Sequence, residues 1–117
     1  MPRHIPRSDA TDRPTLHFDI GTGRLGRDDG LFVRVTRHQG ALIQWFLDHP
    51  GMALTREDAL MALHGAVLTR SDSLIRVRVS HVRGAFAALG AEDAIETVVG
   101  RGYLLRVRVV AERQDAA

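Results

Sequence analysis

Apolar and polar residues alternate in the first ordered part of the chain. The alternation is clear over Leu16–Ile20 and again over Leu31–Val35, with the short run Arg24-Leu25 between them. Successive side chains of a strand point to opposite faces, so a strand with one buried face has this pattern. Turn sequences rich in glycine and aspartate, Gly21–Gly23 and Asp28–Gly30, separate the runs. The pattern predicts a small antiparallel sheet of three strands.

The middle of the chain changes to helical spacing. Thr36 is a suitable N-cap for a helix over Arg37–His49, in which the apolar residues fall on one stripe. Thr55 opens a second helix with a sequence that resembles a capping box, and Gly65 ends that helix as a C-cap. A loop over 66–71 follows.

A third helix is predicted from the N-cap Asp72 to about Leu89. Its apolar residues recur four and three positions apart, which places them on one buried stripe. They are Ile75, Val79, Val82, Phe86 and Leu89. The β-branched residues of 74–79 would also suit a strand. The stripe continues to the end of the segment, however, and so indicates a helix, which Gly90 ends.

Two strand-like runs, Ile95–Val99 and Tyr103–Val109, come next and are joined by Gly100-Arg101-Gly102. Glycine permits positive φ and a close approach of the backbone, as the tip of a tight hairpin requires. We therefore expect a C-terminal β-hairpin. The folded domain is predicted to cover 15–110. A proline-rich, disordered leader or linker at 1–14 precedes it, and a polar tail at 111–117 follows it.

The composition limits the classes of protein to which the chain can belong. With 117 residues, 44% of them apolar, the chain is expected to form one soluble, cytoplasmic domain, with no run long enough to span a membrane. The net charge is only +2, yet all 16 basic residues are arginine. Arginine makes forked contacts to phosphates and guanine edges, although a GC-rich genome favours it too. Between Arg70 and Arg83 there are four arginines and one acid.

Motifs for catalysis or metal binding are missing from the sequence. It has no cysteine, and its six histidines are scattered, without a pair at metal-ligand spacing beside a carboxylate. The spacing Gly21-x-Gly23-x-x-Gly26 fits a dinucleotide-binding loop, but a turn and a strand follow where that motif requires a helix. Neither a Walker loop nor a nucleophile elbow occurs. We expect no cofactor, no metal and no enzymatic activity.

Several residues of the third helix point away from its buried stripe. They are Val77, Arg78, Ser80, His81 and Arg83. In a major groove, arginine and histidine can reach base edges or phosphates, serine can bond a phosphate, and valine can contact a thymine methyl. The alternative is an ordinary solvated face. Arg101 at the hairpin tip can enter a minor groove, or it can simply occupy a β-turn. Two basic elements in succession favour DNA binding more than either does alone.

The order of strands, helices and hairpin resembles the winged helix-turn-helix effector domain of OmpR/PhoB-type bacterial response regulators. The resemblance covers roughly 15–109 and is carried by Leu54–Glu57, Leu63–Gly65, Val77–Arg83 and Ile95–Tyr103. In the last segment, Thr-Val, two glycines and tyrosine follow the family's spacing. The resemblance implies an α+β fold with an N-terminal three-stranded antiparallel sheet, three helices and a C-terminal hairpin wing.

The same resemblance implies what the domain binds. The family binds direct-repeat promoter DNA in two-component systems, with a recognition helix of about 72–89 in the major groove and a wing of 95–109 in the minor groove. Val77 and His81 are then the main base-edge residues. Phosphate or flanking contacts are implied for Ser73, Arg78, Ser80, Arg83 and, in the wing, Thr97. The loop 66–71 is expected to face RNA polymerase, and two copies are expected to bind in tandem.

The chain departs from the family pattern at three places. Arg76 stands where members commonly carry aspartate, and Gly84-Ala85 where they carry a basic pair. Val99 replaces the usual arginine of the wing, with Arg101 two positions further on. No receiver domain fits into 1–14, so the sequence is either an effector half or a stand-alone regulator. The alternative function is a protein-interaction module that contacts polymerase, a partner regulator or a receiver domain.

Overall fold

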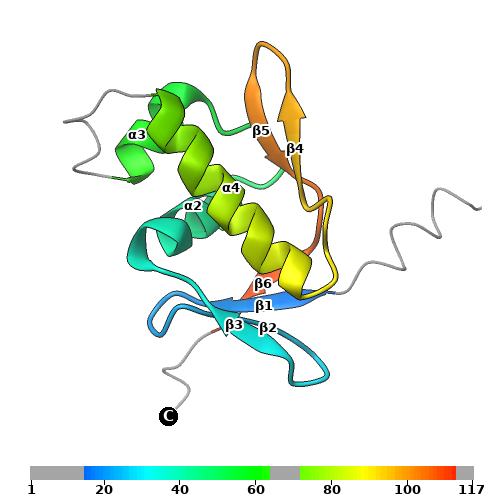
Figure 1. Ribbon diagram of the computed structural model, residues 1–117. Coiled ribbons are helices and arrows are strands. Elements are labelled where there is room, and N and C mark those ends of the chain that lie inside the picture. The colour runs from blue at the N-terminus through cyan, green and yellow to red at the C-terminus, as the bar shows by residue number, and fades with distance from the viewer. Residues whose placement is uncertain (1–14, 64–71, 113–117) are drawn as a thin grey trace, which may run out of the picture.

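The computed structural model describes residues 15–63 and 72–112. The elements in chain order are β1 (Leu16–Asp19), β2 (Arg24–Arg27), β3 (Phe32–Arg34), α2 (Arg37–Asp48), α3 (Arg56–Ala62), α4 (Asp72–Ala88), β4 (Ile95–Val98), β5 (Gly102–Leu105) and β6 (Val109–Ala111). A sheet closes one end of the molecule, α2 and α4 pack on it, and α3 packs against these two helices. The β4–β5 hairpin stands beside α4 at the other end (Figure 1). This arrangement confirms the predicted α+β winged helix. The predicted cap at Gly65 and the loop 66–71 lie outside the described residues.

The N-terminal sheet has four strands rather than the predicted three. Their order is β3-β2-β1-β6; the first two pairs are antiparallel, and β6 is parallel to β1. The run predicted as one wing strand, Tyr103–Val109, instead leaves the hairpin after Leu105. The chain then turns so that Val109 pairs with Leu16 at the free edge of β1. Alternation in a sequence indicates the two faces of a strand but not the partner it takes, which is why this prediction was wrong.

The fourth strand extends the ordered fold beyond residue 110. Ala111 pairs with Phe18, and the N–H of Glu112 donates to the Phe18 carbonyl oxygen at 2.7 Å. Both residues belong to the segment predicted as a polar tail. Ahead of β6, the side chain of Val107 is buried in the core. The C-terminal end of the fold is therefore held by backbone pairing and by apolar packing.

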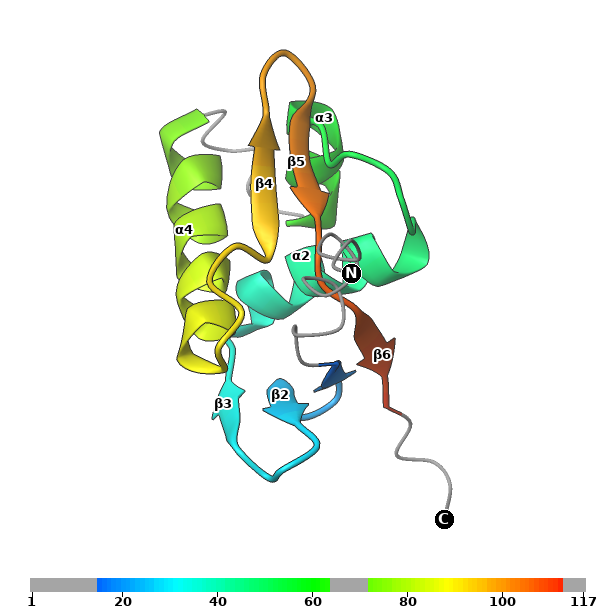
Figure 2. The same ribbon diagram turned by 90° about the vertical axis from the view of Figure 1, so that its right-hand side faces the viewer.

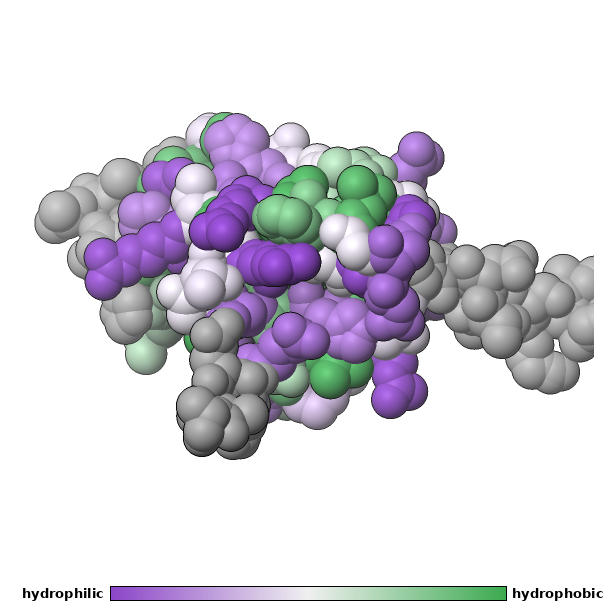
Figure 3. All heavy atoms as spheres, turned by 90° about the horizontal axis from the view of Figure 1, so that it is seen from below, coloured by the Kyte–Doolittle hydropathy of each residue, from purple (hydrophilic) through white to green (hydrophobic). Residues whose placement is uncertain are grey.

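The sheet turns its outer face away from the helices, and that end of the molecule presents apolar and polar groups side by side (Figure 3). Phe32 is 41% exposed, and the guanidinium carbon of Arg24 lies 4.0 Å from its ring centroid. Such a cation–π contact covers part of an apolar ring with a charged group. Within 15–63 and 72–112, the helices lack the length and apolar character that crossing a bilayer would need.

The predicted stripe of α4 is the centre of the core. Its residues Ile75, Val79, Val82, Phe86 and Leu89 are each at most 4% exposed. They pack in one cluster with apolar side chains of β1, β2 and α2. Burial of each large side chain contributes roughly 1.5–3 kcal/mol. The stripe confirms the choice of a helix over a strand for 74–79 and fixes which side of α4 faces solvent.

Capping boxes begin the first two helices. The Thr36 hydroxyl accepts from the Gln39 N–H, and the Gln39 side chain accepts from the Thr36 N–H. Thr55 and Asp58 exchange the same pair of hydrogen bonds. Each box satisfies donors that a helix start leaves unpaired. For α4, the helix already includes Asp72, and the nature of its N-cap lies at the edge of the described residues.

The C-terminal end of α4 is tied to the sheet. Gly90 has a φ of 87°; its N–H donates to Ala87 O, and the next N–H donates to Phe86 O, which is a Schellman motif. The Arg27 guanidinium then donates to the Leu89 carbonyl oxygen at 3.1 Å, placing a positive charge at the negative helix end. Arg27 also pairs with Asp29, and this hydrogen bond lowers the pKa of that carboxyl. The far end of α4 is thereby held in place.

The hairpin is attached to the segment between α2 and α3. The Leu54 N–H donates to Tyr103 O at 2.6 Å, and the Tyr103 N–H donates back to Leu54 O at 3.1 Å. This close approach requires glycine at 102, because an added Cβ would lie 2.0 Å from Leu54 O. The two-glycine spacing of the tip therefore has a packing reason at Gly102 in addition to the turn.

Replacing Gly102 with alanine is expected to lower the free energy of unfolding by about 1–3 kcal/mol, because the new methyl group meets the Leu54 backbone. The matched control is Gly100→Ala, which also has positive φ but finds no atom within 4 Å of the added Cβ. Urea denaturation followed by circular dichroism measures both. Equal losses in the two variants would contradict the contact with Leu54.

Gly84 lies inside α4, where glycine costs about 1 kcal/mol relative to alanine. Because nothing lies within 4 Å of an added Cβ, Gly84→Ala is expected to raise the free energy of unfolding by about that amount. Gly40→Ala in α2 is the control, since its Cβ would meet the Phe18 ring at 3.3 Å. A fall in thermal midpoint for Gly84→Ala would show that the exposed helix position is misassigned.

Candidate nucleic-acid interface

The outer ridge of α4 consists of small and polar residues. Ser73, Val77, Ser80 and His81 are all exposed, and their spacing of three and four residues aligns them along the helix. Val77 is 45% exposed, although valine usually occurs buried. Figure 1 shows α4 in front of the other elements, and Figure 2 shows it at one edge of the molecule, so no other element covers its outward side. The structure thus brings together four of the residues that the sequence singled out, on a surface that can enter a groove.

Arg83 has a different position from the one expected. It lies on the flank of α4 that faces the wing, where Nε and Nη2 donate to the Ile95 carbonyl oxygen at 3.1 and 3.0 Å. Nη2 also donates to Thr97 Oγ1 at 2.8 Å, and the guanidinium lies 5.8 Å from the Tyr103 ring centroid. Arg83 and Thr97 therefore bind each other and join the helix to the hairpin. No local sequence signal indicates this contact, because the partners are 12 and 14 residues apart.

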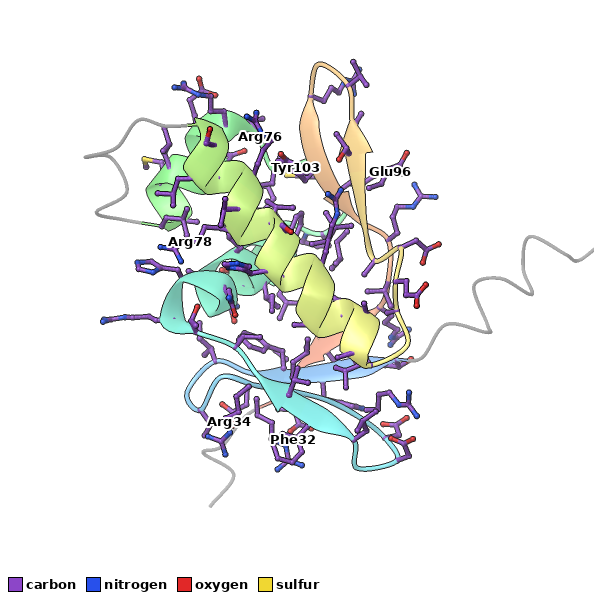
Figure 4. All side chains as sticks on the ribbon, in the orientation of Figure 1. Phe32, Arg34, Arg76, Arg78, Glu96 and Tyr103 are labelled. Carbon is purple, nitrogen blue, oxygen red and sulfur yellow. The ribbon has the colours of Figure 1, made fainter. Side chains whose placement is uncertain are left out.

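Arg78 lies on the opposite flank of α4, turned away from the wing, whereas Arg76 lies on the wing side (Figure 4). Arg78 is half-buried, and its Nε is buried without a hydrogen-bond partner in the part of the chain that the structure describes. It is less accessible than Ser80 or His81. The helical spacing of the two arginines, two residues apart, already implies opposite flanks.

The tip of the hairpin is open to solvent. Arg101 is exposed, and its N–H donates to Val98 O at 2.9 Å, which closes the turn. Val99 beside it is 93% exposed. The tip extends beyond the other elements (Figures 1 and 2). This position is the one expected for a wing that reaches past the recognition helix.

A groove of about 480 Å³ lies between the start of α3, α4 and the hairpin. Three arginines line it, Arg56, Arg76 and Arg101, together with one carboxylate, Glu57. Of these three arginines, the sequence indicated only Arg101 as a DNA contact. Arg76 was noted as a departure from the family pattern, and Arg56 as part of a capping sequence. Their convergence depends on how α3 packs beside α4, which no spacing along the chain displays.

The other large hollow, of about 790 Å³, lies away from this surface, between the β1–β2 turn, the start of α2 and the end of α3. It borders Leu63, the last described residue before the gap. Within 15–63 and 72–112, no group of three histidine, aspartate or glutamate side chains is placed to hold a metal ion. The chemistry concentrated around α4 and the hairpin is that of guanidinium, hydroxyl and imidazole donors.

Comparison with known proteins places the chain in a family. The family described as "Transcriptional regulatory protein, C terminal" matches residues 30–105. The transcriptional regulatory protein GltR of Pseudomonas aeruginosa is 33% identical over 93 residues, which cover 79% of this chain and 38% of GltR. The response regulator GraR of Staphylococcus epidermidis is 24% identical over 106 residues, covering 87% of this chain and 47% of GraR. The chain thus spans less than half the length of these relatives.

Two solved structures share the fold. The DNA-binding domain of E. coli CadC aligns with a TM-score of 0.62 at 22% identity, covering 81% of this chain and 94% of that domain. The C-terminal domain of the nisin resistance regulator NsrR aligns with a TM-score of 0.58 at 24% identity, covering 80% and 89%. The chain therefore belongs to the family of C-terminal domains of transcriptional regulatory proteins, the OmpR/PhoB-type winged helix-turn-helix domains that bind DNA in transcription regulation.

Proposed function

We propose that this domain binds promoter DNA with α4 in the major groove and the β4–β5 hairpin in the adjacent minor groove. The observation that carries the proposal is the exposed ridge of α4, small and polar along its length and uncovered by other described elements. A 17-residue helix is about 25 Å long, and the major groove of B-DNA is about 12 Å wide, enough to admit it. Short side chains at 73, 77 and 80 let the helix backbone come close to the base edges.

Individual roles follow from position. His81 and Val77 contact base edges, the imidazole through a hydrogen bond and the valine through a thymine methyl. The hydroxyls of Ser73 and Ser80 bond phosphates, as serine commonly does at such interfaces. Arg101 enters the minor groove, whose negative potential attracts arginine.

Arg78, Arg83 and Thr97 have less direct roles. Arg78 contacts the DNA backbone at the flank, if the guanidinium turns outward from its half-buried position. Arg83 and Thr97 hold the wing at its angle to α4 through their mutual hydrogen bond. They are positioning residues in this proposal rather than the phosphate contacts that the family resemblance implies.

Two further partners, RNA polymerase and a second copy of the domain, are proposed on the family resemblance alone. The resemblance supports a contact of 66–71 with RNA polymerase and a tandem pair of domains on repeated half-sites. A role purely as a protein-interaction module has less support, because three of the four ridge residues, Ser73, Ser80 and His81, are polar. The core of a protein interface is commonly apolar and aromatic. The family comprises transcription-factor domains rather than enzymes, and we propose that this domain acts by binding alone.

His81→Ala is expected to weaken binding to a duplex selected from a random DNA pool by about 1–3 kcal/mol, or roughly 5–150-fold. The expected cause is a lost hydrogen bond to a base edge. The control is His17→Ala on the N-terminal sheet, whose partners are the exposed carboxylates of Asp28 and Glu112. Fluorescence anisotropy titrations measure both variants. Unchanged specific affinity in His81→Ala would remove α4 from the major groove.

Arg83→Ala is expected to lower the free energy of unfolding by about 1–3 kcal/mol, because it removes charge-assisted hydrogen bonds to Ile95 and Thr97. Arg83→Lys should not restore the loss, since an ammonium group cannot reproduce the forked contacts. Denaturation in the absence of DNA measures this effect separately from binding. A variant with full stability and weakened DNA binding would show that Arg83 contacts phosphate directly.

A further inference from the structure

The groove between α3, α4 and the hairpin has an excess of positive charge. Three guanidinium groups line it, from three different elements, against the single carboxylate of Glu57. Arg76 comes from α4 and faces the wing (Figure 4), and Arg101 comes from the hairpin tip. At neutral pH arginine stays charged, so these groups cannot relieve their repulsion by losing a proton. An anion between them lowers the electrostatic energy.

Arg76 and Arg101 differ from the arginines that hold the fold together. Arg27 bonds Asp29 and the Leu89 carbonyl oxygen. Arg83 bonds Ile95 and Thr97. Arg106 pairs with Glu96. The side chains of Arg76 and Arg101 have no hydrogen bond or ion pair with any residue of 15–63 or 72–112. Both are exposed. Their donors therefore remain available to a ligand.

The walls of the groove suit a sugar–phosphate backbone. The half-buried Tyr103 contributes apolar surface, against which a deoxyribose can pack. Gly100 and Gly102 leave the hairpin backbone without side chains, so a ligand strand can come close to it. The volume of about 480 Å³ exceeds what one small ion needs and is consistent with a segment of polymer. Shape and charge together indicate a phosphodiester.

One sugar–phosphate strand separates a major groove from the adjacent minor groove. A protein with a helix in the first and a hairpin in the second must straddle this strand, and the space between helix and hairpin is where the strand runs. We propose that the groove binds this strand and that Arg76 and Arg101 grip the same phosphate from its two sides. The inference rests on the proposed function and assigns to Arg76 a role that the family pattern does not supply.

The positive charge at position 76 distinguishes this site from the same place in family members. The family commonly has aspartate there, which would repel a phosphate in the groove. Arginine at 76 reverses the interaction from repulsion to attraction. With arginine at 101 rather than at 99, the second guanidinium also comes from a residue that lines the groove. The two departures therefore act in one place and in the same direction.

Salt-dependent binding tests the proposal. Affinities of the full 117-residue chain for a random duplex of about 20 bp are measured by anisotropy over a series of NaCl concentrations. Each phosphate contact contributes about −0.9 to the slope of log K against log[salt]. Because the remaining arginine still neutralises the shared phosphate, Arg76→Ala and Arg101→Ala should each keep most of the slope. The double variant removes the contact and should reduce the slope by about 0.9.

Arg34→Ala is the control, since it removes the same charge from the opposite end of the molecule (Figure 4). Its slope should equal that of the unmodified protein. If the double variant also keeps the full slope, the phosphate site is wrong while DNA binding stands. If each single variant loses about 0.9 and the two losses add in the double variant, the two residues grip different phosphates, and the shared site is wrong. Absence of salt-sensitive binding by the unmodified protein would overturn the proposed function, and the phosphate site with it.

Discussion

The burial of one stripe of α4 is the constraint on which the rest of the structure depends. Ile75, Val79, Val82, Phe86 and Leu89 fill the space between the sheet and α2, and none is more than 4% exposed. Rotation of α4 about its axis would expose these apolar groups and cost several kcal/mol. The direction of the ridge from Ser73 to His81 is thus a consequence of core packing. A surface that meets a partner is rigid here because its reverse side is buried.

The hairpin is positioned by polar contacts in addition to the apolar packing of Ile95 and Leu105. Backbone bonds between Leu54 and Tyr103 hold β5 close to the tip of the hairpin, and Arg83 bridges β4 to α4. Gly102 permits the first contact because no Cβ separates the two backbones. Hydrogen bonds are directional, so these contacts restrict the angle between helix and hairpin. The spacing between the two elements that we propose to contact DNA therefore depends partly on a few donors and acceptors.

Interactions between residues close together in the sequence were predicted, and interactions between residues far apart were missed. The stripe of α4 and the capping pairs of Thr36 and Thr55 are local, and the structure confirms them. The pairing of β6 with β1 and the bond from Arg83 to Ile95 are long-range. The local sequence does not distinguish the alternatives in either case. A strand of alternating residues can pair in either sheet, and an arginine on a helix flank can face solvent or bond a neighbouring element. The family resemblance did not indicate the bond from Arg83 to Ile95 either, since it implied only a phosphate or flanking contact for that residue.

The small net charge of +2 is consistent with DNA binding because charge acts locally. At physiological salt, a charge is screened beyond about 8 Å, so a phosphate senses the arginines beside it rather than the whole protein. Several arginines of this chain neutralise carboxylates or bond carbonyl groups within the fold and contribute little outward field. Arg76 and Arg101 are exposed and line the groove beside α4 with a single acid, Glu57. Affinity for a polyanion therefore depends on which arginines are left unpaired by folding, a quantity that total charge does not measure.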